Sequence, residues 1–261
     1  RRDSAGERKF AEHLDFGNID KKQECWQSLL DDETILEHDA NTPPTSFMYQ
    51  PEWTVMLEKA CREKDKNNWF AHYQLATIYL VDKRIKDAKN EIMRSYKIKP
   101  TAWALNVLSM IALEENKKVK AAQYAIEASK MLPDDLCLTR FASEFAYKYA
   151  TREMCREYIE WMERLGSSDG RLRLNLALCY IKLQNIEKAQ EILFADDFEV
   201  TDIREGDNIL TEVYVMLEKL RAKKSGVKFN KKAVPIPEKF DFRMSENPDK
   251  KVKPQRAAAA I

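Results

Sequence analysis

Glycine and histidine are scarce in this sequence of 261 residues, which contains 6 glycines and 3 histidines. The glycines form neither a phosphate-binding loop nor a nucleophile elbow, because the spacing of neither motif occurs. The histidines, His13, His38 and His72, have no metal-ligand spacing, and no two cysteines form a C-x-x-C pair. The sequence therefore predicts no catalytic residue, no metal site and no cofactor, and thus no enzyme activity for this chain.

Long apolar runs and strand-like alternation are also missing. No stretch has the length and hydropathy of a transmembrane helix, and the first residues do not resemble a signal peptide, so we expect no contact with a membrane. The cysteines are odd in number and widely separated, which is typical of a reduced, cytoplasmic protein: Cys25, Cys61, Cys137, Cys155 and Cys179. The lack of alternation, together with the few glycines, predicts an all-α fold.

An excess of charge is missing as well, since the net charge is +1. A nearly neutral chain has no overall preference for nucleic acid or anionic membrane. From Lys219 onward, however, 13 Lys or Arg residues stand against 4 Asp or Glu. We interpret this run as a solvated tail or as an arm that docks on an acidic surface. A nucleic-acid adaptor that uses the tail is disfavoured, and it would bind with a steep dependence on salt.

What is present is a repeat of small and apolar residues between Trp69 and Pro133. The first copy comprises His72, Leu75, Ala76, Tyr79, Ala88, Ile92, Ser95 and Pro100. The second copy follows at an offset of 33 residues: Leu105, Leu108, Ser109, Ala112, Ala121, Ala125, Ala128 and Pro133. This spacing predicts pairs of antiparallel helices, because small residues let two helices cross closely and proline ends the second helix.

Two further copies follow. The third is weaker and comprises Ala142, Ser143, Ala146, Cys155, Ile159 and Met162, with Gly166 in place of the last proline. The fourth lies 101 residues after the first and comprises Leu176, Ala177, Tyr180, Ala189 and Leu193. Three periods of about 34 residues account for that displacement.

The spacing resembles the tetratricopeptide repeat, with His72 where that pattern has Trp. The resemblance implies helix hairpins stacked into an α-α superhelix. Residues 69–73, 101–105, 204–207, 210–212 and 235–244 also resemble the C-terminal part of a family of large, mostly bacterial, poorly characterised proteins. In that family a β-rich region, similar to sugar-binding aldose-epimerase-like folds, precedes the repeats. This second resemblance implies that the chain is the helical part of a longer protein. Arg1 fits that expectation, because it looks like an internal position and not like a natural N-terminus.

The flanking segments divide the chain into four predicted regions. Residues 1–50 are expected to form an irregular lead-in with a short helix, and residues 51–200 the helical repeats. Residues 201–226 should form a capping helix with Asn208 as its N-cap, which hides the last apolar face of the stack. Residues 227–261 should form an extended basic tail, because alternating prolines at Pro235 and Pro237 exclude a helix. We expect the repeats to behave as one domain.

The predicted binding surface is a concave wall made by the first helix of each pair. Its residues lie opposite the packing alanines: Phe70, Tyr73, Thr77, Trp103, Asn106, Met110, Arg140, Glu144, Tyr147, Arg171, Leu174 and Leu178. Aromatic, Met and Arg side chains are those that binding surfaces favour. The occupant would be the chain's own tail over Pro235–Met244, an upstream domain, or a partner protein or peptide; the wall could also bind nothing specific.

The predicted function is therefore a non-catalytic scaffold, a module for protein–protein or interdomain docking. The alternative is an accessory C-terminal module of a carbohydrate-active enzyme whose catalytic β domain lies upstream.

Overall fold

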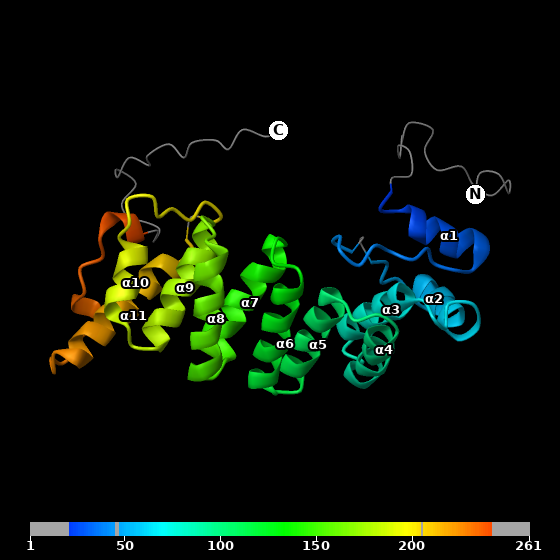
Figure 1. Cartoon of the computed structure of the whole chain (residues 1–261), viewed down its shortest axis with the longest axis horizontal. Coiled ribbons are helices and arrows are strands. Elements are labelled where there is room, and N and C mark those ends of the chain that lie inside the picture. Colours follow the sequence, from blue (N-terminus) through cyan, green and yellow to red (C-terminus); the bar gives the residue numbers. More distant parts are fainter. Residues whose placement is uncertain (1–20, 45–46, 205, 242–261) are drawn as a thin grey trace. The chain divides into compact units, whose positions relative to one another are not determined.

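The computed structural model describes residues 21–44, 47–204 and 206–241, and within them it contains α-helices and short 3-10 turns but no strand (Figure 1). The helices are α1 (Glu24–Asp32), α2 (Pro51–Glu63), α3 (Trp69–Val81), α4 (Ile85–Ile98), α5 (Ala102–Glu114), α6 (Lys118–Met131), α7 (Leu136–Tyr149), α8 (Arg152–Leu165), α9 (Gly170–Lys182), α10 (Ile186–Leu193) and α11 (Ile209–Lys224). The 3-10 turns are η1 (Lys231–Ala233) and η2 (Glu238–Phe240). The predicted all-α class is confirmed. The predicted lead-in over residues 1–20 and the end of the tail over residues 242–261 lie outside the described residues.

The helix boundaries reproduce the offsets found in the sequence. The first helices α3, α5 and α9 begin at Trp69, Ala102 and Gly170, so they are displaced by 33 and 101 residues. The turns between paired helices repeat as well, because Lys83, Asn116 and Gln184 adopt left-handed backbone conformations with φ of 60°, 59° and 65°. One local geometry therefore recurs in three of the four copies. The weaker third copy departs from it, since a short extended link joins α7 to α8.

Each first helix begins at a capping residue whose side chain accepts backbone N–H groups. Asn68 accepts from the first turn of α3, Thr101 from α5, Asp135 from α7 and Asp169 from α9. A cap of this kind stabilises a helix by about 1 kcal/mol. The capping helix α11 differs: Asn208 occupies its N-cap position without a side-chain cap hydrogen bond, and Asp207 accepts the N–H of Ile209 instead.

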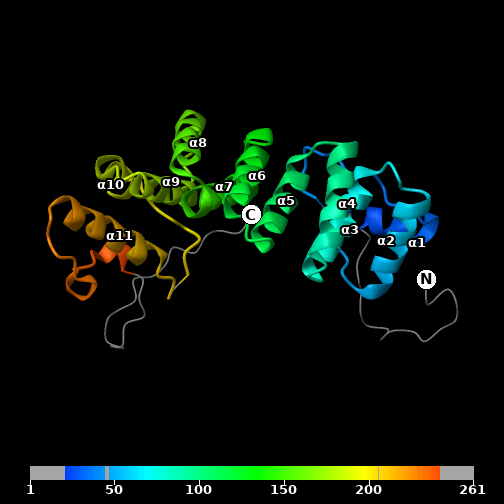
Figure 2. The same ribbon diagram turned by 90° about the horizontal axis from the view of Figure 1, so that it is seen from below.

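The contacts divide the chain into two compact units, residues 1–132 and residues 133–261. In unit 1, α3 packs on both α4 and α5, α5 packs on α6, and α2 precedes them against α3 (Figure 2). The crossing residues Ala76, Ala88 and Ala121 are 0% exposed. Two serines at such crossings also link helices, since Ser95 Oγ donates to Trp69 O and Ser109 Oγ donates to Ala121 O, both at 2.8 Å. Close packing at these positions explains the small residues of the repeat.

In unit 2, α9 is the central helix and packs on α7, α8, α10 and α11. Its crossing residue Ala177 is 0% exposed. Asn175 on α9 donates a 2.7 Å hydrogen bond to Ser143 on α7, which joins the third and fourth copies. Helix α11 packs on α9 and α10 and buries Leu210, Val213 and Leu217.

Candidate functional site

The predicted wall residues lie on first helices of both units, so each unit has a wall of its own. The unit 1 wall comprises Phe70, Tyr73, Thr77, Trp103, Asn106 and Met110, on α3 and α5. The unit 2 wall comprises Arg140, Glu144, Tyr147, Arg171, Leu174 and Leu178, on α7 and α9. The surroundings of each wall decide which of these side chains a partner can reach.

The aromatic side chains of the unit 1 wall are largely covered. Phe70 is 0% exposed and Trp103 is 6% exposed. Tyr73 stacks on Phe70 with ring centroids 6.1 Å apart, and burial raises the pKa of its phenol to about 12. Asn106 and Met110 are half-buried. An aromatic surface of this kind is consistent with binding, but here it already has an occupant.

The occupant is an extended segment, residues 33–44 between α1 and α2, which we call the strap (Figure 1). The strap makes main-chain hydrogen bonds to unit 1. Ile35 N donates to Asp65 Oδ2 at 2.8 Å, and Asn68 Nδ2 donates to Ile35 O at 2.7 Å. Farther along, Trp103 Nε1 donates to Ala40 O at 2.9 Å. The strap therefore runs from the start of α3 to the start of α5.

Two side chains of the strap pack on the body of unit 1. Ile35 is 2% exposed, and the His38 ring stacks on Phe70 with centroids 4.9 Å apart. Its neighbour Leu36 is 51% exposed and points away from the core. The strap is thus anchored by one buried aliphatic residue and one stacked ring.

Carboxylates of the strap pair with exposed lysines of unit 1. Glu33 lies 2.6 Å from Lys59 Nζ and 3.4 Å from Lys64 Nζ, and Glu37 lies 3.6 Å from Lys99 Nζ. The hydrogen bond from Lys59 lowers the pKa of Glu33. Exposed pairs contribute little energy each, but together they mark the surface as complementary to an acidic segment.

Two carboxamides on the same helices have buried polar atoms without a hydrogen-bond partner among the described residues. Gln74 is 1% exposed, and both its Oε1 and its Nε2 are unpaired. On α5, Asn106 Oδ1 is also unpaired. Gln74 lies one helical turn beyond Phe70, and Asn106 lies one turn beyond Trp103, so both are displaced from the strap's contacts in the same direction along their helices.

A different segment, residues 194–204 and 206–208, contacts part of the unit 2 wall, and we call it the α10–α11 loop (Figure 1). Asp202 of this loop receives hydrogen bonds from Arg171 Nε and Nη2, at 3.2 and 2.9 Å, and lies 3.5 Å from Arg140 Nη1. Asp197 receives a 2.8 Å bond from Arg173. Leu174, also on α9, is 0% exposed.

The backbone of the α10–α11 loop touches the first residue of α9. A Cβ atom added to Gly170 would lie 1.8 Å from Glu199 O, so only glycine permits this approach. Val200 and Ile203 of the loop are 9% and 7% exposed. The loop is therefore packed against α9 as well as paired with it.

Arg140 of this wall is itself fixed by Asp169, the N-cap of α9. Arg140 donates to Asp169 through Nε at 3.0 Å and through Nη2 at 2.5 Å. Burial alone would raise the pKa of Asp169, but the guanidinium and the N–H of Leu172 outweigh it, and the pKa is lowered. This pair is a bidentate contact of the kind that orients both partners.

The C-terminal tail, predicted to lie along the first helices, packs elsewhere in its described part. Phe240 is 0% exposed and stacks on Tyr214 of α11 at 5.1 Å. Thr211 Oγ1 donates to Phe240 O at 2.6 Å, and Lys239 Nζ donates to Leu193 O at 2.8 Å. The tail thus covers α11 and the end of α10, while Phe242 and Met244 lie outside the described residues. The strap and the α10–α11 loop occupy the walls in its place.

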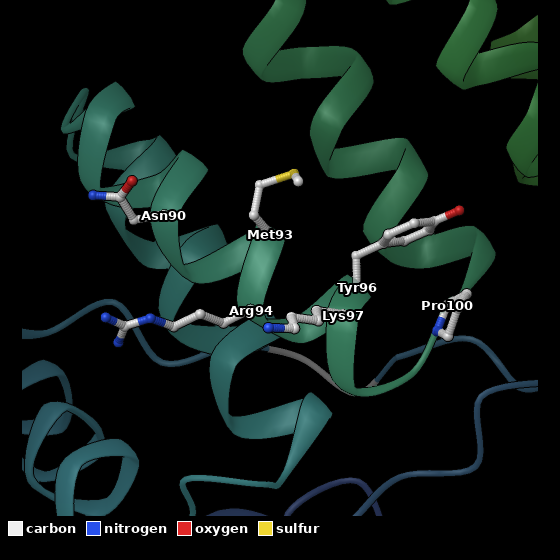
Figure 3. Close-up of a pocket in the computed structure, with 6 residues that line it drawn as sticks. All are labelled: Asn90, Met93, Arg94, Tyr96, Lys97 and Pro100. Carbon is white, nitrogen blue, oxygen red and sulfur yellow. The ribbon is translucent and has the colours of Figure 1, made fainter.

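One open hollow that the sequence analysis did not identify lies on the outer face of α4 (Figure 3). Its volume is about 810 Å³, and it is lined by Asn90, Met93, Arg94, Tyr96, Lys97 and Pro100. Figure 3 shows Met93 and Tyr96 projecting to one side of it, and Arg94 and Lys97 reaching to the other. Met93 is 48% exposed. The hollow could have been predicted from the sequence, because its residues from Asn90 to Pro100 are spaced 3–4 apart and Met93 is an apolar residue on an otherwise polar helix face.

The residues that the structure describes contain no group of three or more His, Cys, Asp or Glu side chains that could hold a metal ion. All five cysteines are free thiols, and burial raises the pKa of Cys61 to about 12. In the same described ranges, no helix is both long and apolar enough to cross a membrane.

Helix pairs that recur with offsets of 33 and 101 residues define an all-α protein of the helical-repeat type. Comparison of the chain with protein-family models, curated proteins and solved structures gives no match.

Proposed function

We propose that this protein is a non-catalytic helical-repeat module of the tetratricopeptide type that binds extended polypeptide segments, and that it serves as a docking or scaffold part of a larger protein. The observation that carries the proposal is the strap. An extended segment already lies against α3 and α5: its Ile35 N donates to Asp65, and Asn68 and Trp103 donate to its backbone carbonyl groups.

Main-chain recognition supports a binding function because every polypeptide offers the same N–H and C=O groups. Recognition of this kind gives affinity for extended chain, while pockets for individual side chains give specificity. In the strap only Ile35 fills such a buried position. The wall of unit 1 is thus suited to extended segments with one aliphatic anchor.

The repeat pattern supports the tetratricopeptide assignment. The spacing of His72, Leu75, Ala76 and Tyr79 fits that repeat, and the buried alanines lie where its helices cross. The free thiols fit the reducing cytoplasm, which is the compartment we propose.

The test is a selection of phage-displayed 16-residue peptides on the full chain, followed by hydrogen exchange of the chain with each selected peptide. We expect binders in the micromolar range that protect amides of α3 and α5. The matched control is Met93→Asp, which alters the open hollow on α4 and leaves the wall intact. Binding that disappears in this variant would place the site on α4, and a selection without any binder would refute the function.

A further inference from the structure

The strap and the α10–α11 loop share one chemical pattern although they belong to different units. In the strap, Glu33 and Glu37 flank Ile35. Both carboxylates pair with lysines, and Ile35 is 2% exposed. Residues 31–39 contain five acidic residues and no Lys or Arg.

The α10–α11 loop repeats the pattern with other residues. Asp197 and Asp202 flank Val200, which is 9% exposed. Asp197 pairs with Arg173 at 2.8 Å, and Asp202 pairs with Arg171 at 2.9 Å. In both units, therefore, basic side chains hold an acidic segment that buries a β-branched residue between two paired carboxylates.

We infer that the unit 1 wall accepts, in place of the strap, an extended acidic segment of a partner protein with a β-branched aliphatic residue between two carboxylates. This inference rests on the proposed function and names the chemistry of its ligand. The strap is then a built-in competitor that occupies the wall until the partner segment replaces it.

Few buried apolar contacts hold the strap on the wall. Ile35 is the only buried residue among those of the strap. The pairs of Glu33 with Lys59 and of Glu37 with Lys99 join side chains that are 44–59% exposed. Such pairs are screened by solvent and contribute little. A segment with few buried apolar contacts opens far below the cost of global unfolding.

A partner segment could also use hydrogen-bonding groups that the strap leaves unpaired. Gln74 offers a free donor and a free acceptor, and Asn106 Oδ1 offers a free acceptor. Both lie one turn beyond the strap's contacts at Phe70 and Trp103 on the same helices. Leaving such groups buried and unpaired is unfavourable, so a segment that reaches them gains over the strap.

The test uses the full chain and a fluorescein-labelled peptide with the sequence of residues 31–44 as the probe. We compare the wild type with Ile35→Ala, which weakens the strap, and with the matched control Leu36→Ala, which alters an exposed neighbour. We expect the peptide to bind Ile35→Ala at least 10-fold more tightly than the wild type, because the apparent affinity scales with the fraction of chains whose wall is vacant. Leu36→Ala should bind like the wild type.

The chemistry is tested by changing the probe. A peptide carrying Ile35→Asp should bind Ile35→Ala at least 10-fold more weakly than the parent peptide. One carrying both Glu33→Gln and Glu37→Gln should bind about 3-fold more weakly, as the loss of two exposed ion pairs predicts. If the neutral peptide binds as tightly as the acidic one, the proposed chemistry is wrong.

Hydrogen exchange separates the failure modes. In the Ile35→Ala variant, hydrogen exchange should rise in the strap and stay unchanged in α6. If this variant does not fold, the double variant Glu33→Lys and Glu37→Lys takes its place, because it releases the strap by changing exposed side chains alone. A released strap with no binding of the probe overturns the inference. In that case the proposed function is still supported if selected peptides protect the amides of α3 and α5 from hydrogen exchange, and it is refuted if no peptide protects them.

Discussion

Replacement of Gly170 by alanine should detach the α10–α11 loop from α9. The added Cβ would lie 1.8 Å from Glu199 O, 2.8 Å from Glu199 C and 3.1 Å from Val200 Cα. Favourable contacts between heavy atoms occur at about 3.5–4.0 Å. All three neighbours are backbone atoms, so no change of rotamer can relieve the overlap, and the loop itself must move.

The magnitude follows from what the loop loses. Moving it exposes Val200 and Ile203, which are 9% and 7% exposed in the folded state. Each aliphatic side chain contributes about 1.5–3 kcal/mol when fully buried. Against this, alanine is favoured over glycine in a helix by at most about 1 kcal/mol. For the two side chains together we expect a net loss of about 2–5 kcal/mol.

The assay is urea unfolding followed by far-UV circular dichroism, together with hydrogen exchange in residues 194–208. The matched control is Gly166→Ala, because Gly166 has a φ of +64° and a Cβ there would meet nothing within 4 Å. It should cost about 1 kcal/mol through backbone conformation alone and leave exchange of the loop unchanged. A Gly170→Ala protein as stable as the wild type, with a protected loop, would refute the reasoning.

Four further substitutions test other parts of the structure. Asp169→Asn should destabilise unit 2 by about 1–3 kcal/mol at pH 7 by removing the charge that Arg140 binds. Because the pKa of Asp169 is lowered in the folded chain, this stabilisation is present at pH values above the ordinary aspartate pKa of 3.8 and is lost as the pH falls below it. The urea unfolding curves of the wild type and of Asp169→Asn should therefore converge in acid. Gln184→Gly should increase the free energy of unfolding by about 0.5–1 kcal/mol and so raise the melting temperature, because the backbone φ at Gln184 is 65° and glycine adopts it without strain. Lys83→Gly should give a smaller increase, because it also removes the ion pair between Lys83 and Glu114 of α5. Trp103→Phe should increase hydrogen exchange in the strap without unfolding α5, since it removes the indole donor and keeps a ring; unchanged exchange would show that this hydrogen bond does not hold the strap.

The sequence repeat marks the wall residues but does not mark the open hollow on α4. Phe70 and Trp103 are conspicuous because they occupy equivalent positions in successive copies, 33 residues apart. Met93 has no such partner, since the residue 33 positions later, Ile126, is 7% exposed. A surface feature that is not repeated leaves no periodic trace.

The sequence by itself determined the helices, their pairing and their register. Small residues at helix crossings and capping residues such as Asn68 and Asp169 act within a few residues or at a fixed period, so their spacing alone predicts the local geometry. Only the tertiary structure decided what covers the walls. Trp103 bonds to Ala40 across 63 positions, and Arg171 bonds to Asp202 across 31. Contacts of this kind join single polar groups in irregular segments, and because they follow no period, only the folded chain shows that the strap and the α10–α11 loop lie on the first helices.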